Sequence, residues 1–132
     1  MDTPTTKAWT FTKPGEPSEV LTLDTAYPKP DFPPQLPIPK AVEHLLAEEW
    51  ILIRVAYAGL NHGTSFYLRV LPAWARKAGP VVPELDFSGV VEDVWDPSSD
   101  GNKKPRLAKG DAVCGFIPVS FAWPTGTGAL QG

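Results

Sequence analysis

The sequence predicts a mainly β fold with short helices, built as a partly open barrel within one domain. The first observation is length and composition: 132 residues with 42% hydrophobic and 20% charged side chains suit a single globular domain. The second is the proline content, because 16 prolines limit the length of any helix. The third is the alternation of short apolar runs with turns rich in glycine and proline, which is typical of open barrels.

The first third of the chain predicts two short strands followed by a connection. Residues 8–11 are short and aromatic, and residues 19–23 alternate apolar with polar side chains, as a half-buried strand does. The stretch 27–39 is rich in proline, which cannot donate ladder hydrogen bonds, so we interpret it as an extended surface connection. Residues 40–49 carry helix-forming side chains and predict a short helix.

The middle of the chain predicts the strongest strand and a broken helix. Residues 50–58 are apolar on both faces, which predicts a buried strand. Residues 64–77 predict a helix that Pro72 interrupts. Its large apolar side chains recur at helical spacing: Phe66, Val70 and Trp74. We expect the five tryptophans of the chain to fill the core and the domain interface.

The last third predicts two more strands. Residues 80–83 are extended, and residues 87–95 form a strand in which Gly89 sits against a neighbouring backbone. A polar loop over 96–104 and a tight turn over 107–111 then precede a last buried strand at 112–116. The tail from Pro124 to Gly132 is rich in glycine and carries no predicted element.

Charge and cysteine usage exclude several function classes. Twelve basic against fifteen acidic side chains give a net charge of −3, which argues against a nucleic-acid partner. No apolar run approaches the ~20 residues of a membrane span, and the N-terminus lacks a signal-peptide pattern, so we expect a cytoplasmic protein with no membrane partner. The single cysteine, Cys114, excludes a cysteine-rich zinc site and predicts an inert buried thiol.

Three segments in order carry a family resemblance: Val55–Asn61, Pro83–Val91 and Lys109–Gly115. They resemble the N-terminal, GroES-like domain of the medium-chain dehydrogenase/reductase superfamily. Such domains typically show AAGLNxxD after a strand, then PxxPGxDFxGxV, then GDxVxG, then a glycine-rich segment. The resemblance covers the chain from about Lys7 to Leu130 and implies a GroES-like, partly open barrel that is incomplete at its C-terminus.

The resemblance also implies a zinc-independent member. Zinc-dependent alcohol dehydrogenases of the superfamily place a cysteine where this chain has Asn61, and a Gly-His-Glu triplet where it has Glu84-Leu85-Asp86. Leu85 has no lone pair to donate, and a neutral amide is a poor zinc ligand. The chain therefore looks like the branch of quinone oxidoreductases and enoyl reductases, and we expect no metal site.

In that branch NADPH supplies the hydride and is held by a separate Rossmann domain. The chain has no G-x-G-x-x-G, and Gly126-Thr127-Gly128 lies in no strand–turn–helix unit. We therefore expect residues 1–132 to be the substrate-side domain of a truncated product that lacks the Rossmann domain and binds no cofactor alone. An unpaired sheet edge would promote homodimers or wider association.

Asn61 is the predicted catalytic residue. It follows a strand and a glycine, and the resemblance makes it the active-site Asn that hydrogen-bonds the nicotinamide ribose or the substrate. An amide donates and accepts at once, which suits a carbonyl or hydroxyl partner. The alternative is a turn-forming Asn without chemistry.

Four further residues are predicted at the edge of the substrate or cofactor site: His62, Thr64, Tyr67 and Asp86. Each has a structural alternative: a surface or capping His62, a helix-capping Thr64, a Tyr67 in the core or on the surface, and a structural Asp86. General acid–base work by Asp86 with Glu84 is not expected.

The sequence thus predicts the substrate-side domain of an NADPH-dependent, zinc-independent oxidoreductase. It would act on a small molecule with an activated C=C or a quinone. The alternative is a non-catalytic fragment or a binding protein without turnover. A co-chaperonin-like barrel would leave the dehydrogenase-like motifs unexplained.

Overall fold

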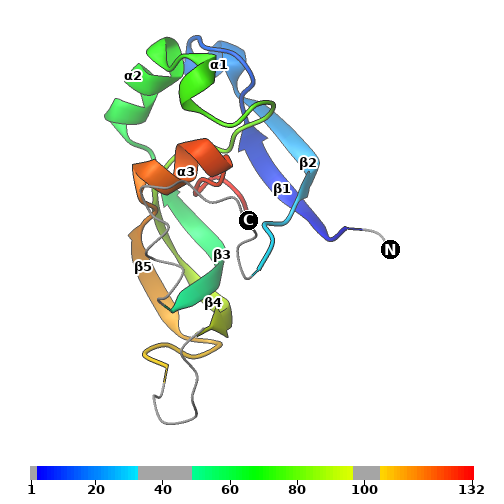
Figure 1. Cartoon of the computed structure of the whole chain (residues 1–132), viewed down its shortest axis with the longest axis vertical. Coiled ribbons are helices and arrows are strands. Elements are labelled where there is room, and N and C mark those ends of the chain that lie inside the picture. Colours follow the sequence, from blue (N-terminus) through cyan, green and yellow to red (C-terminus); the bar gives the residue numbers. More distant parts are fainter. Residues whose placement is uncertain (1–2, 33–48, 97–104) are drawn as a thin grey trace.

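The computed structural model describes residues 3–32, 49–96 and 105–132. Within these ranges the chain is mainly β, as predicted, with two antiparallel sheets, short helices and no closed barrel. Figure 1 shows α1 and α2 together at one end of the molecule. The elements are β1 Thr5–Thr10, α1 Pro17–Val20, β2 Thr22–Pro28, β3 Trp50–Gly59, α2 His62–Val70, η2 Ala73–Ala75, β4 Asp86–Trp95, β5 Ala112–Phe116 and α3 Val119–Thr125.

The larger sheet has the order β3-β4-β5, and all three of its strands lie where the sequence predicts strands. Gly89 in β4 is opposite Val55 in β3 and Val113 in β5. A Cβ at Gly89 would lie 2.3 Å from the carbonyl oxygen of Arg54, so only hydrogen fits there, as predicted. The expectation that β3 is buried on both faces is wrong, because β3 is an edge of this sheet and Tyr57 is 78% exposed.

The smaller sheet pairs β1 with β2 and is extended by the C-terminal tail. The Trp9 N–H donates to the carbonyl of Leu130 at 3.0 Å, and the Gly132 N–H donates to that of Lys7 at 3.1 Å. The tail, for which the sequence predicts no element, therefore runs to the β1–β2 sheet (Figure 1). Before it lies α3, which the sequence analysis missed because Pro124 stands inside that helix.

The predicted strand over 19–23 is wrong in its first half. A short helix, α1, takes residues 17–20, and β2 starts at Thr22. Pro17 occupies the first turn of α1, where its fixed φ suits a helix and its missing N–H costs nothing. The alternating pattern also fits this helix, since its buried side chain is Val20.

The predicted helix over 64–77 starts earlier and ends sooner than expected. Helix α2 begins at His62 and ends at Val70, and η2 follows Pro72. The three apolar side chains at helical spacing face solvent, with Phe66, Val70 and Trp74 at 57%, 51% and 87% exposure. The opposite side of the segment is buried instead, through Leu68 and Leu71.

The core lies where α1, α2 and the end of β1 meet. Its buried members are Phe11, Val20, Leu68 and Val81. Phe11 and Val81 exchange two backbone hydrogen bonds of 3.0 Å each, which join the end of β1 to the segment before β4. Residues 81–83 are thus buried, and Val81 is bridged to Phe11 at the end of β1, within the segment 80–83 where the sequence predicts an extended chain.

The expectation that Cys114 is buried is wrong. Cys114 is exposed, and the residues of β5, an edge strand of the described sheet, are mostly open to solvent. Of the five tryptophans, expected in the core and the domain interface, Trp9 and Trp74 are 45% and 87% exposed and so lie outside the core. The predicted helix over 40–49 and the polar loop over 96–104 lie almost wholly outside the described residues.

Candidate functional site

Asn61 stands between the end of β3 and the start of α2. Its side-chain Oδ1 accepts the backbone N–H of Gly63 at 2.7 Å, so it caps the helix. Its carbonyl accepts the N–H of Thr64 at 3.0 Å. The side-chain nitrogen Nδ2 has no hydrogen-bond partner within the described ranges, and the residue is exposed. Asn61 therefore caps α2, and its side-chain nitrogen stays available as a donor.

A buried carboxylate lies directly behind this helix start. Glu84 is 7% exposed, and its Oε2 accepts the N–H of Asn61 at 3.1 Å and the hydroxyl of Thr64 at 3.0 Å. Burial raises the pKa of the Glu84 carboxyl, the two hydrogen bonds lower it in part, and the charge of Asp86 raises it further. Glu84 was not among the predicted site residues. The sequence signal for it is that it stands just before β4, where the motif PxxPGxDFxGxV has a glycine.

Thr64 and Asp86 lie on two sides of Glu84. Thr64 is half-buried in the first turn of α2, where it contacts Glu84, while the capping role expected of it belongs to Asn61. Asp86 is the first residue of β4, exposed and paired in register with Gly59. A Cβ at Gly59 would lie 3.0 Å from that of Asp86, so the two strand ends are in close contact.

In the described part of the chain no hydrogen bond joins His62 or Tyr67 to the side chains of this group. His62 is exposed at the first position of α2. Tyr67 is 40% exposed and packs edge-on against Trp123, with ring centroids 4.4 Å apart, so it joins α2 to α3. The structure thus brings Asn61, Thr64 and Glu84 together. Tyr67, more than one helical turn after Asn61, packs against α3 instead.

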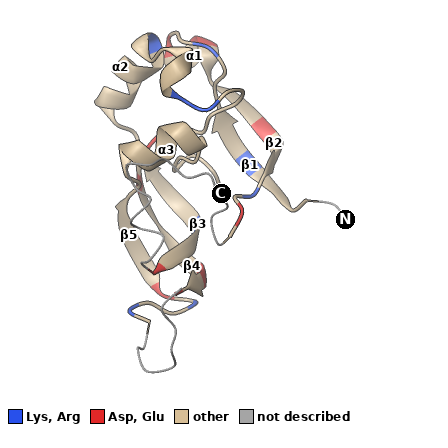
Figure 2. Ribbon diagram, in the orientation of Figure 1, with Lys and Arg blue, Asp and Glu red and all other residues tan. Residues whose placement is uncertain are grey.

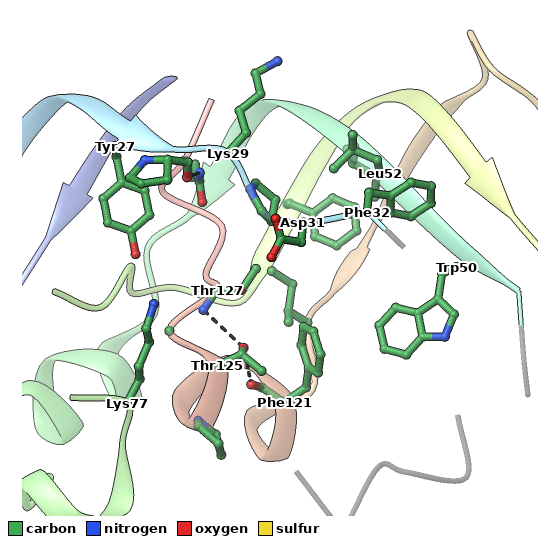
Figure 3. A pocket seen from close by; sticks show the side chains of 18 of the residues that line it. Tyr27, Lys29, Asp31, Phe32, Trp50, Leu52, Lys77, Phe121, Thr125 and Thr127 are labelled. Atoms are coloured by element: carbon green, nitrogen blue, oxygen red, sulfur yellow. Dashed lines mark hydrogen bonds between the residues drawn. The ribbon is translucent and has the colours of Figure 1, made fainter. Parts of the chain in front are cut away.

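A separate cavity of about 940 Å³ lies near the gap between the two sheets (Figure 3). The Thr125 hydroxyl on one side of it donates to the carbonyl of Phe121 at 2.6 Å and accepts the N–H of Thr127 at 3.4 Å. None of Asn61, Thr64 and Glu84 lines this cavity. Its labelled lining is largely aromatic and apolar, with some polar groups: Tyr27, Lys29, Asp31, Phe32, Trp50, Leu52, Lys77, Phe121, Thr125 and Thr127.

Charged side chains are scattered over the ribbon rather than gathered on one face (Figure 2). Several basic side chains are paired with acids, as in the Arg69–Glu16 contact of 2.7 Å between α2 and the start of α1. The described residues hold no group of three or more His, Cys, Asp or Glu side chains placed to bind a metal ion. Among the helices that the structure describes, none is long and apolar enough to cross a membrane.

Comparison with known proteins places these features in context. No family model matches the chain. The chain is similar to enoyl reductases, a class of oxidoreductase. The relative is the trans-enoyl reductase poxH of Penicillium oxalicum, in two sequences of which one is from strain 114-2, each 31% identical over 139 aligned positions. The alignment covers 98% of this chain and 33% of the relative, so the chain spans about a third of the relative's length.

Proposed function

We propose that the chain is the substrate-side, GroES-like portion of an NADPH-dependent, zinc-independent oxidoreductase that reduces an activated C=C or a quinone. The observation that carries the proposal is the similarity to a trans-enoyl reductase along nearly the whole chain. The mainly β architecture and the free amide donor at the start of α2 are consistent with it.

The chain's own residues account for one part of such a reaction. When hydride adds to the C=C bond of an enone or enoyl thioester, negative charge develops on the carbonyl oxygen. A donor fixed at that oxygen stabilises the charge. Asn61 fits this task, because its Oδ1 is held by Gly63 and its Nδ2 remains available as the donor.

The two glycines of the tail have roles in the packing of the chain. Gly126 ends α3 with a φ of 75°, and a Cβ at Gly128 would clash with the carbonyl oxygen of Val82. We assign no NADPH contact to this chain, and its proposed part is to bind and polarise the acceptor.

A chimera tests the proposal. The 132 residues replace the matching third of the Penicillium relative, and NADPH consumption is followed with a short α,β-unsaturated thioester. We expect activity that a metal chelator does not change. A folded chimera without activity would favour the alternative, a binding protein without turnover.

Two substitutions of Asn61 sharpen the test. Ser caps a helix nearly as well as Asn, so Asn61→Ser keeps α2 but loses the Nδ2 donor. Removing one such donor lowers kcat by about a hundredfold or more in comparable sites. Asn61→Ala removes both the cap and the donor and should also lower stability. Full activity of the Asn61→Ser chimera would remove Asn61 from the chemistry.

A further inference from the structure

Glu84 has an unusual backbone conformation. Its φ is 68°, in the left-handed region that favours glycine, and every other residue with positive φ in the described ranges is a glycine. The backbone of a residue other than glycine is strained there, so the surrounding structure must hold Glu84 in this conformation.

The surroundings of Glu84 supply that restraint on two sides. Its carbonyl accepts the N–H of Ala129 at 2.8 Å, and the carbonyl of Pro83 accepts that of Leu130 at 3.3 Å, so the C-terminal tail clamps the turn. On the other side its Oε2 accepts from the backbone of Asn61 and the hydroxyl of Thr64. The strained turn therefore aims a buried carboxylate at the start of α2.

This carboxylate holds two groups directly. It holds the peptide N–H of Asn61 and, through Thr64, the first turn of α2. The Asn61 side chain is then fixed by its own bond to Gly63. With the peptide, the first turn and Oδ1 all held, the direction of Nδ2 is determined by the fold rather than by free rotation of the side chain.

We propose that Glu84 is a positioning residue that orients the amide of Asn61 toward the substrate carbonyl. The proposal rests on the function proposed above for Asn61. Glu84 touches no substrate in this arrangement and acts only through the helix start.

Nuclear magnetic resonance of the 132-residue chain tests the contact without reference to activity. Glu84→Gly relaxes the backbone and removes the acceptor, so hydrogen exchange at the Asn61 amide should rise by about tenfold or more. The Asn61 side-chain NH₂ signals should also shift. Glu84→Gln keeps an acceptor oxygen and should behave as the wild type. Glu92→Gln, on the same strand as Asp86, is the control and should leave both signals unchanged.

The chimera tests the consequence for the reaction. Glu84→Gly should lower kcat by about tenfold to a hundredfold with little change in KM, because the donor is misplaced rather than lost. Glu84→Gln should restore most of the rate, because it keeps an acceptor oxygen in the same place. Thr64→Val removes one of the two contacts and should give an intermediate rate, and it carries the test if Glu84→Gly fails to fold.

The outcomes separate the two proposals. If the wild-type chimera is inactive, the proposed function fails, and the amide signals alone decide whether Glu84 positions Asn61. If Asn61→Ser slows the chimera and Glu84→Gly does not, the positioning role is overturned while the function stands. Unchanged Asn61 signals in Glu84→Gly would overturn the positioning role in any case.

Discussion

The two sheets are completed in different ways. The β3-β4-β5 sheet is built from strands that follow one another in the chain, each antiparallel to the next. The β1-β2 sheet depends on distant residues: the tail pairs with β1 at Ala8 and Gln131, and the end of β1 bridges Phe11 to Val81. One sheet is thus closed by neighbours in sequence, and the other by segments about 70 to 120 residues away.

The difference implies that the two sheets respond to different perturbations. A substitution inside the larger sheet disturbs contacts between β3, β4 and β5 directly, because the described sheet consists of these strands alone. A change at the tail or at Val81 acts on the closure of the smaller sheet, where local opening is the first effect. The predictions below test this contrast, from the largest expected effect to the smallest.

The largest effect is expected at the centre of the larger sheet. In Gly89→Ala the new Cβ meets the Arg54 carbonyl oxygen, a backbone atom that cannot rotate away, so β3 must move. We expect a loss of about 3–4 kcal/mol in the free energy of unfolding, measured by urea denaturation. The matched control is Gly115→Ala in β5, where the Cβ meets the Phe87 ring at 3.4 Å, an ordinary contact. Equal losses in the two variants would contradict the prediction.

The core beside the smaller sheet should give the next effect. Val81 is fully buried at 0% exposure, and Val81→Ala leaves a void next to Phe11. We expect a loss of about 2 kcal/mol in the same assay. Val119→Ala, at a site 39% exposed, is the control and should cost well under half as much. A cost at Val81 no greater than at Val119 would show that this cluster is not a packed core.

Removing the end of the tail should open the smaller sheet alone. Deleting Gln131 and Gly132 removes the bonds from Gln131 to Pro28 and from Gly132 to Lys7. We expect about 1–2 kcal/mol less stability. Hydrogen exchange should become faster in β1 while β4 amides keep their protection. Equal loss of protection in both sheets would mean that they open as one unit.

The smallest effect concerns pH. The pKa of Glu84 is raised in the folded chain above its ordinary value of 4.5, so the native state holds more protons than the unfolded state just above that pH. Stability should therefore fall as pH rises from about 4.5 through the folded pKa, and then level off. Glu84→Gln should lack this decline when both proteins are unfolded in urea across that range. A wild type that gains stability relative to Glu84→Gln would reverse the sign and contradict the prediction.

The strands of the larger sheet could be predicted because their signals are local. The apolar runs at 50–58, 87–95 and 112–116 are long enough to define strands, and Gly89 marks a close approach of backbones. The exposure of Phe66 and Trp74 could not be predicted in this way, since helical spacing shows that a face exists but not what covers it. Similarly, Pro17 allows either a turn or a helix start, and the burial of Val20 decides between them.

The place of Asn61 could be predicted for the same reason. A strand end followed by Gly59 and Asn61 marks a helix start, and the structure places Asn61 there. The contact from Glu84 joins residues 23 positions apart and depends on a positive φ. Glu84 stands where the motif PxxPGxDFxGxV has a glycine, which marks a special backbone position, but residue types do not show that its side chain reaches α2. The local pattern therefore predicts the position of Asn61 but not its contact with Glu84.

The exposed thiol of Cys114 has a practical consequence for handling the protein. The 132 residues contain one cysteine, so a disulfide formed by these residues alone must join Cys114 of two chains. The thiol stands on an edge strand of the described sheet. Antiparallel pairing of two β5 edges, in the register that places the two Cys114 residues opposite each other, would bring the sulfur atoms within bonding reach. Air oxidation would convert such brief encounters into covalent dimers that a reducing agent dissolves. The fraction of dimer in size-exclusion chromatography would then depend on how long the sample was stored without a reducing agent.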